Sequence, residues 1–152
     1  MDRPDLDIEL LASEIWPTLT GEWKTNAPVP IPGMPCGTAT SEYTYGPLSD
    51  GAYPFEGTTV ITCCGCCRVK EKTTGQVSGD GTSISATSRN GFQSHGTLAA
   101  MDAKSNKVTY QWTGSSAQGP ISGTSVVEPT TWTDTIHTNG RTLVFVFSKV
   151  CS

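Results

Sequence analysis

The sequence predicts an all-β protein: an up-and-down antiparallel meander that closes into a barrel, with a short N-terminal helix. Three observations lead to this fold class. Ser (15) and Thr (23) supply a quarter of the 152 residues, and together with 16 Gly and 10 Pro they favour strands and turns. From residue 37 onwards, apolar and polar side chains alternate with a period of two. Beyond residue 80, turn signals such as Asp-Gly and Asn-Gly recur about every ten to fifteen residues.

Closure of the sheet follows from the number of strands. A meander of roughly eight to ten short strands has exposed edges, and closing into an up-and-down barrel removes them. A β-sandwich is the alternative, because periodicity does not report closure. The length predicts one domain over residues 1–152, with the helix in residues 1–17 and the barrel in residues 18–152.

The charge distribution excludes some partners. Residues 1–22 carry six acidic residues and one basic residue, whereas residues 23–152 carry eight acidic and nine basic residues. No basic stripe is present to neutralise a phosphate backbone, so we expect no nucleic-acid binding. We also expect no membrane insertion, because no apolar run approaches the roughly 20 residues of a membrane helix.

The N-terminus indicates a cytoplasmic location. It alternates acidic and apolar residues and lacks the basic and apolar regions of a secretory signal. In a reducing compartment the six cysteines are thiols or metal ligands rather than disulfides.

The first elements are a helix, a strand and a proline-rich loop. We expect a helix over residues 4–16, because Ile8, Leu11 and Ile15 recur at helical spacing and share one face. Trp16-Pro17 is expected to end this helix. We expect this helix to cover one end of the sheet structure. A short strand follows at residues 19–24, and residues 27–36 form a loop that packs on the rest of the molecule.

The later strands alternate inward and outward residues. Val108, Tyr110 and Trp112 should point inward, while Thr109 and Gln111 face water. Side chains two residues apart lie on one face of a strand, so the three bulky residues are buried together, and a register slip of one residue would expose all three. The same alternation within each of the other strands places these apolar residues inside: Tyr53, Phe55, Ile61, Phe92, Leu98, Ala100, Trp132, Ile136, Leu143, Phe145 and Phe147. Val144 and Val146 are also apolar, so we expect the N-terminal helix to cover the outside of the last strand.

The order of these features resembles the lipocalins and the wider calycin superfamily. The resemblance is carried by the helix, by Gly21-Glu22-Trp23 on the first strand, by the long loop and by the meander. It implies a calycin-like barrel in which Trp23 closes the bottom and the 27–36 loop forms a lid over the mouth. It also implies a late basic residue, Arg141, packed over the Trp23 ring.

The second half is similar to an uncharacterised bacterial lipocalin-like family. The matching segments are residues 92–98, Met101-Asp102, residues 108–112 and residues 132–147. Lipocalins often tie the C-terminal tail to a mid-barrel strand, which here would join Cys151 to Cys63 or Cys64 under oxidising conditions.

One cysteine cluster is a weak metal candidate. The candidate ligands form two overlapping Cys-x-x-Cys pairs: Cys63, Cys64, Cys66 and Cys67. This spacing occurs in zinc sites and in redox sites, but a zinc site needs a second, separate pair, and only Cys36 and Cys151 remain. We therefore expect small hydrophobic thiols that fill both faces of a strand or hairpin, with no metal and no cofactor.

The predicted site is the barrel lumen. Its candidate ligand-binding residues are inward aromatic residues: Tyr43, Tyr53, Phe55, Tyr110, Trp112, Trp132 and Phe145. Asp134 shares the parity of Trp132, and a desolvated carboxylate could act as a general acid or base, with Tyr110 as a second candidate. The alternative for Asp134 is a hydrogen-bonded structural role.

Three functions fit this pattern. The leading hypothesis is a binding protein that holds one apolar or amphipathic small molecule in the lumen. The second is an isomerase, cyclase or lyase that uses the same cavity, and the third is a cysteine-based metal or redox module. The sequence contains no nucleophile elbow, phosphate loop or dinucleotide fingerprint. It does not predict the oligomeric state.

Overall fold

A computed structural model describes residues 14–31, 36–63, 67–89, 91–102, 104–117, 119–138 and 140–150. Their strands form one antiparallel sheet of eleven members. In chain order these are β1 (Gly21–Thr25), β2 (Val29–Pro30), β3 (Thr38–Tyr45), β4 (Ala52–Cys63), β5 (Cys67–Ser78), β6 (Ser83–Ser88), β7 (Gln93–Asp102), β8 (Lys107–Ser116), β9 (Gly119–Val127), β10 (Thr131–Thr138) and β11 (Arg141–Lys149).

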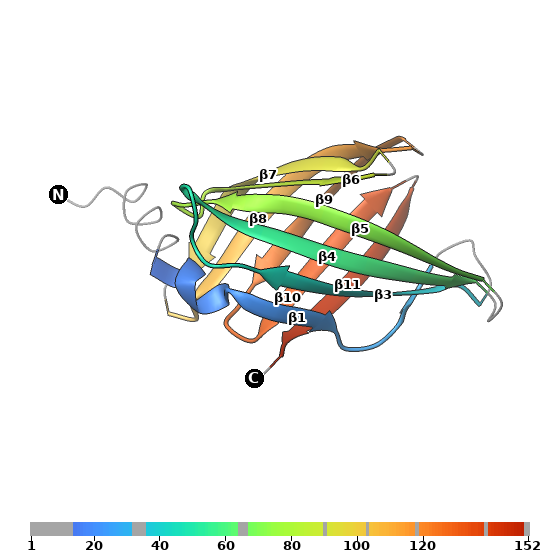
Figure 1. The fold of residues 1–152 in the computed structure, drawn as a ribbon, viewed down its shortest axis with the longest axis horizontal. Helices are drawn as coiled ribbons and strands as arrows, with labels where there is room; N and C mark the ends of the chain where they lie inside the picture. The colour runs from blue at the N-terminus through green and yellow to red at the C-terminus, as the bar shows by residue number, and fades with distance from the viewer. Residues whose placement is uncertain are drawn as a thin grey trace.

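The sheet closes on itself at β1. Strands β3 to β11 each pair with the next along the chain, and β1 pairs with both β11 and β3 (Figure 1). Among the described residues this makes a barrel of ten strands, with β2 as an extra strand on β3. The predicted all-β meander and its closure are confirmed, and the sandwich is excluded. Lipocalin barrels have eight strands, two fewer than this one.

The predicted turn signals lie between the strands. Asp50 and Gly51, between β3 and β4, have φ angles of 53° and 80°, and Gly81 and Gly140 also have positive φ. Asp, Asn and Gly adopt this left-handed conformation most readily, which is why these dipeptides mark the hairpins.

The helix closes one end of the barrel. It is described over residues 14–19 and continues past Pro17, so the expected end at Trp16-Pro17 is wrong. The hydroxyls of Thr18 and Thr20 donate to the carbonyls of Ile15 and Pro17, at 2.6 and 3.1 Å, which satisfies acceptors in the last turn. The expected start of the helix lies outside the described residues.

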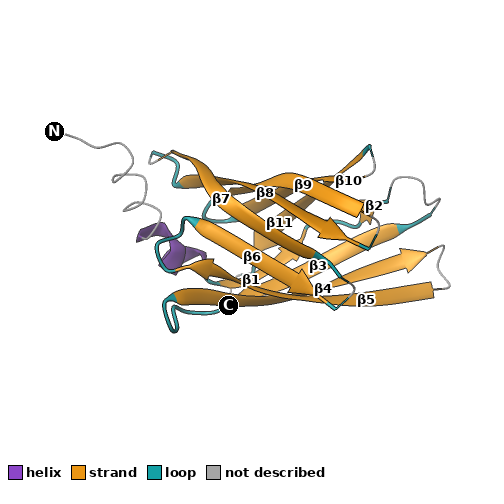
Figure 2. Cartoon of the chain, turned by 90° about the horizontal axis from the view of Figure 1, so that it is seen from above, coloured by secondary structure: helices purple, strands orange, loops and turns teal. Residues whose placement is uncertain are grey.

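The position of the helix confirms that it covers one end of the sheet structure, and it overturns the expectation that it covers the last strand. It lies at the end of the barrel rather than against the outside of β11 (Figures 1 and 2). Val144 is accordingly 46% exposed. The helix directs the large apolar side chains of Trp16 and Leu19 into the barrel end, and both are fully buried. This position removes more of their apolar surface from water than a position on the outer wall would. No described helix has the length and apolar character to cross a membrane.

The core follows the predicted parity, with one correction. Val108 and Tyr110 are fully buried, whereas Gln111 is exposed. On β7 the register shifts between Leu98 and Ala100, and this bulge places Ala100 opposite the outward Thr109. Ala100 is therefore exposed rather than inward as expected, because one extra residue in a strand reverses the faces beyond it.

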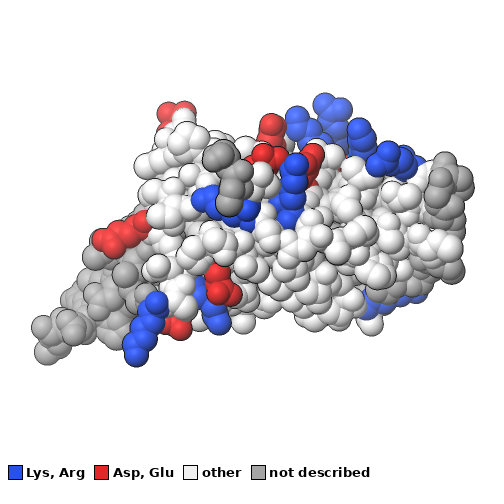
Figure 3. Space-filling model, turned by 90° about the horizontal axis from the view of Figure 1, so that it is seen from below, with Lys and Arg blue, Asp and Glu red and all other residues white. Residues whose placement is uncertain are grey.

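The outer surface is largely uncharged on the face shown in Figure 3, with Lys and Arg gathered near one edge. Three basic residues, Arg68, Lys70 and Lys72, alternate along β5 and are exposed. They lie on the part of the β4–β5 hairpin that extends beyond β6, which pairs only with Thr73–Val77 of β5.

Candidate functional site

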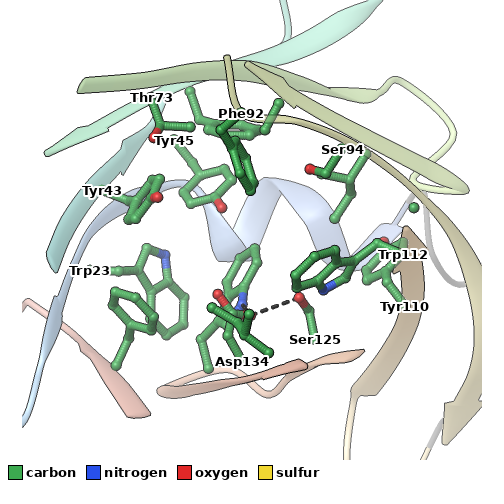
Figure 4. A pocket seen from close by; sticks show the side chains of 17 residues that line it. Trp23, Tyr43, Tyr45, Thr73, Phe92, Ser94, Tyr110, Trp112, Ser125 and Asp134 are labelled. Carbon is green, nitrogen blue, oxygen red and sulfur yellow. Dashed lines mark hydrogen bonds between the residues drawn. The ribbon is translucent and has the colours of Figure 1, made fainter. Parts of the chain in front are cut away.

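The barrel lumen contains a partly open cavity of about 120 Å³, whose lining is drawn in Figure 4. Most of its lining is aromatic: Trp23, Tyr43, Tyr45, Phe55, Phe92, Tyr110, Trp112, Trp132 and Phe147. The polar side chains among its 17 lining residues are, besides the tyrosines, Thr73, Ser94, Ser125 and Asp134. Figure 4 shows Asp134 on one side of this space and Tyr45 and Phe92 on the other.

Glycines on neighbouring strands leave room for the cavity. Tyr43 lies directly opposite Gly57, and a Cβ placed on that glycine would meet the Tyr43 ring at 2.3 Å. Trp112 is opposite Gly123, where a Cβ would meet the indole at 2.5 Å. The rings therefore lie flat over the glycine backbone and do not fill the lumen. The third such pair is Phe55 over Gly75.

Asp134 is held by two neutral donors. Its Oδ1 atom accepts a hydrogen bond from Ser125 Oγ at 2.7 Å (Figure 4) and another from Trp132 Nε1 at 2.6 Å. Ser125 is opposite Asp134 on β9, and Trp132 precedes it by two residues on β10, so strand geometry places all three on the inner face.

The second carboxylate oxygen faces the cavity. No described residue donates a hydrogen bond to Asp134 Oδ2. In the described part of the chain, every fully buried side-chain oxygen or nitrogen has a hydrogen-bond partner, so Oδ2 is not fully buried. Asp134 lines the cavity, so the accessible surface of Oδ2 belongs to the lumen. Burial raises the pKa of Asp134 to about 6, because removal from water outweighs the two hydrogen bonds that favour the charged form.

Two tyrosines of β3 face Asp134. Burial raises the pKa of Tyr43 and of Tyr45, and the negative charge of Asp134 raises both further. Tyr45 stacks on Trp132 with ring centroids 4.9 Å apart. These phenols therefore stay neutral at physiological pH.

The cavity floor is held together by Tyr110. Its hydroxyl accepts a hydrogen bond from Trp16 Nε1 at 2.7 Å and donates to the Gly81 carbonyl at 2.5 Å. Burial raises the pKa of Tyr110 well above its usual range. Since the Tyr110 proton already has an acceptor, this geometry favours a structural role over acid–base chemistry.

Five of the seven residues predicted to bind a ligand line this cavity, while their role in binding stays a prediction. Tyr43, Phe55, Tyr110, Trp112 and Trp132, all proposed as ligand-binding residues, line the cavity. The other two candidates are buried elsewhere: Tyr53 packs against Trp16, with ring centroids 5.8 Å apart, and Phe145 stacks on Phe147 at 6.3 Å.

The predicted ligand-binding residues did not include four other aromatic residues that line the cavity: Trp23, Tyr45, Phe92 and Phe147. Alternation placed Phe92 and Phe147 inside, and Trp23 was expected to close the barrel, but none of the three was assigned to the ligand.

The expected contact between Trp23 and Arg141 is wrong. Trp23 is buried at the helix end, where its Nε1 donates to the Leu19 carbonyl at 3.0 Å, and it lies opposite Lys149. Arg141 begins β11 at the opposite end, because β11 runs antiparallel to β1. The basic residue at the helix end is Lys149, whose Nζ donates to the Thr18 carbonyl at 2.5 Å.

The proline-rich loop is partly described. Val29 is buried opposite Ala39, and the Ile31 amide donates to the Gly37 carbonyl at 3.0 Å. Residues 32–35 lie outside the described part, and none of residues 27–31 lines the cavity. The loop therefore packs on the barrel as expected, while its role as a lid stays a prediction.

The cysteine cluster lies at the tip of the β4–β5 hairpin, where Cys63 is opposite Cys67. Cys64, Cys66 and Cys151 are outside the described residues, so the suggested disulfide stays a prediction. Within the described ranges no three His, Cys, Asp or Glu residues are grouped to hold a metal ion.

Comparisons with known proteins report the fold. Neither a family model nor a curated protein matches this chain. Among solved structures, the chain is similar to the crystal structure of Rv2717c from M. tuberculosis, with a TM-score of 0.63 and 10% sequence identity. The alignment covers 92% of this chain and 98% of that one. At this identity the likeness shows a shared barrel architecture.

Proposed function

We propose that this protein binds one small molecule in the lumen of its barrel. The observation that carries the proposal is an aromatic cavity with a single carboxylate oxygen turned into it. Apolar walls with a few convergent polar groups are typical of small-molecule sites. The glycines beneath the Tyr43 and Trp112 rings support this function, because larger residues there would bring the rings into the lumen.

The cavity volume limits the size of the ligand. An apolar cavity of about 150 Å³ accommodates benzene, so a lumen of about 120 Å³ suits a molecule of one ring or of comparable bulk. For roughly seven non-hydrogen atoms, even the best efficiency of about 1.5 kcal/mol per atom limits the affinity to roughly 10 kcal/mol. That ceiling corresponds to a dissociation constant of roughly 50 nM, so we expect measured values above it, up to the micromolar range.

Tryptophan fluorescence can test lumenal binding directly. Trp23, Trp112 and Trp132 line the cavity, so a ligand there should change the emission. We would titrate the protein with benzene by fluorescence, and test phenol and aniline, which absorb and emit close to tryptophan, by ligand-observed NMR. Lack of binding by the whole panel would contradict the proposed function.

Two variants change the lumen in opposite ways. Trp112→Ala removes one wall, and Gly57→Ala pushes the Tyr43 ring into the cavity. Each should weaken binding by at least about tenfold, through lost contacts in the first and lost space in the second. Val144→Ala, on the exposed outer face, is the matched control and should bind as the wild type does.

An acid–base enzyme in the same cavity is the second candidate. It is favoured by the Asp134 pKa of about 6, which suits proton transfer near neutral pH. NMR spectra of each bound molecule, followed over hours, would show isomerised, cyclised or cleaved product. Asp134→Asn should then abolish turnover while the lumen still binds.

A further inference from the structure

We infer that the lumenal ligand is a small organic cation, held between the Asp134 carboxylate and the surrounding aromatic rings. This inference rests on the proposed function, because it assigns a chemical class to the molecule bound in the lumen. Three features of the cavity carry it: its charge, its aromatic walls and the cost of leaving Asp134 unpaired.

The charge in the cavity is not balanced. Asp134 is ionisable and acidic, and none of the lining residues is Lys, Arg or His. Its hydrogen bonds come from the neutral groups of Ser125 and Trp132. The described ion pairs join Lys24 and Lys72 to exposed glutamates on the outside of the barrel. A buried anion normally has a positive partner, and here a ligand would supply it.

The walls around Asp134 present aromatic rings to the same space. Trp132 stacks on Tyr45 at 4.9 Å and meets the edge of Trp23 at 5.7 Å. Figure 4 shows Trp23 and Tyr43 on one side of Asp134 and Trp112 on the other. Aromatic faces attract cations, most strongly where water is excluded, and clusters of such rings bind quaternary ammonium groups.

Folding has already removed much of the water around Asp134, which is the cause of its raised pKa. Forming a buried ion pair usually requires the desolvation of both partners, but here only the ligand still has to lose its hydration. An anionic ligand would face the carboxylate, and a neutral hydrocarbon would leave Oδ2 without a partner. A cation with apolar substituents uses both the carboxylate and the rings.

Titration of Asp134 gives this inference a specific signature. The other titratable groups that line the lumen are Tyr43, Tyr45 and Tyr110, whose pKa values are raised, so they stay neutral below pH 9. The charge of Glu71 on β5 also raises the pKa of Tyr43. Glu71 accepts a hydrogen bond from Ser88 Oγ at 2.9 Å. A permanent cation should bind tightly above pH 6, where Asp134 is charged. Below pH 6 Asp134 becomes protonated, so the affinity for the cation should fall about tenfold per pH unit.

The test compares choline with 3,3-dimethyl-1-butanol, its uncharged carbon isostere. Both have the same shape, so their difference in affinity isolates the charge. At pH 8, calorimetry and tryptophan fluorescence should show choline binding at least about thirtyfold more tightly. Choline has no titrating group in this range, so any loss of affinity between pH 7 and pH 5 reports on the protein.

Asp134→Asn is the decisive variant, because it keeps an oxygen for Ser125 and Trp132 and removes the charge. Its pH dependence should disappear, and its preference for choline should fall to the part that the aromatic rings alone supply. Glu56→Gln removes a charge on the exposed face of β4 and should leave both intact. Near-UV circular dichroism confirms that each variant is folded.

The outcomes separate this inference from the proposed function. If the isostere binds as well as choline, or if Asp134→Asn retains the full preference, the cation assignment is overturned and the lumenal site stands. If choline, its isostere and the aromatic panel all fail to bind, both proposals fall.

Discussion

The two ends of the barrel are built differently. At the helix end, Trp16, Leu19, Val77 and Val127 have no exposed surface, and the indole N–H groups of Trp16 and Trp23 both have buried acceptors. At the other end, the β4–β5 hairpin extends past β6, and Val69 is 49% exposed. Large apolar side chains are therefore concentrated at the closed end, and the cavity lies above this rigid floor.

This difference teaches where stability and binding are located. A side chain at the helix end contributes through many contacts and a satisfied hydrogen bond, so its loss should destabilise the whole barrel. A side chain at the other end has fewer neighbours to lose. Asp134 lies between them, in a position where burial of its charge opposes folding.

The largest effect should come from the closed end. Trp16→Ala should lower the free energy of unfolding by about 3–5 kcal/mol, because it leaves a cavity beneath Tyr45 and Tyr110 and removes the indole donor. Urea denaturation measures the change. Val69→Ala, at the opposite end, should cost less than about 1 kcal/mol. Similar losses for the two variants would show that the ends do not differ.

Asp134→Asn should stabilise the protein. Folding raises the pKa of Asp134 from 3.8 to about 6, so the folded state binds more protons than the unfolded state between these values. The contribution of Asp134 to stability is therefore most favourable below about pH 4 and declines up to about pH 6. Above pH 6 the penalty is constant.

The pH dependence of unfolding checks this second prediction. At pH 7 Asp134→Asn should raise the free energy of unfolding by about 2–3 kcal/mol, and at pH 4 the gain should nearly vanish. The variant should also flatten the decline between pH 4 and pH 6. A destabilised variant at pH 7 would mean that the charge is compensated within the protein.

A smaller effect is expected where β11 meets the helix. Lys149→Met retains most of the aliphatic chain but removes the ammonium that donates to the Thr18 carbonyl, so it should cost about 1 kcal/mol. Lys72→Gln, which breaks an exposed ion pair with Glu56, should cost less than about 0.5 kcal/mol. Thermal unfolding of both variants at low salt compares the two lysines.

The sequence predicted the barrel wall better than its ends. Alternation and turn dipeptides specify which face of each strand is buried, and this was sufficient to place Tyr43, Phe55, Trp112 and Trp132 around the lumen. The same parity placed Asp134 inside. Its hydrogen bonds to Ser125 and Trp132 depend on register between strands, which parity alone does not give.

The ends depend on contacts between distant segments. The buried face of Trp16 was missed because the helix was expected to end there and to lie outside β11. Arg141 was assigned to Trp23 from the resemblance to lipocalin barrels, whereas the direction of β11 brings Lys149 to Trp23. The bulge on β7 reversed Ala100, and no local signal marks its position.

Closure through the short strand β1 has a kinetic consequence. Trp23 pairs with Lys149 on one side and with Tyr43 on the other, and the contact between Lys149 and Thr18 spans 131 positions in the chain. The hairpins can form locally, but this seam requires the last strand to be in place. We expect the seam to close late in folding, when the nascent sheet still has two unpaired edges and self-association competes with closure.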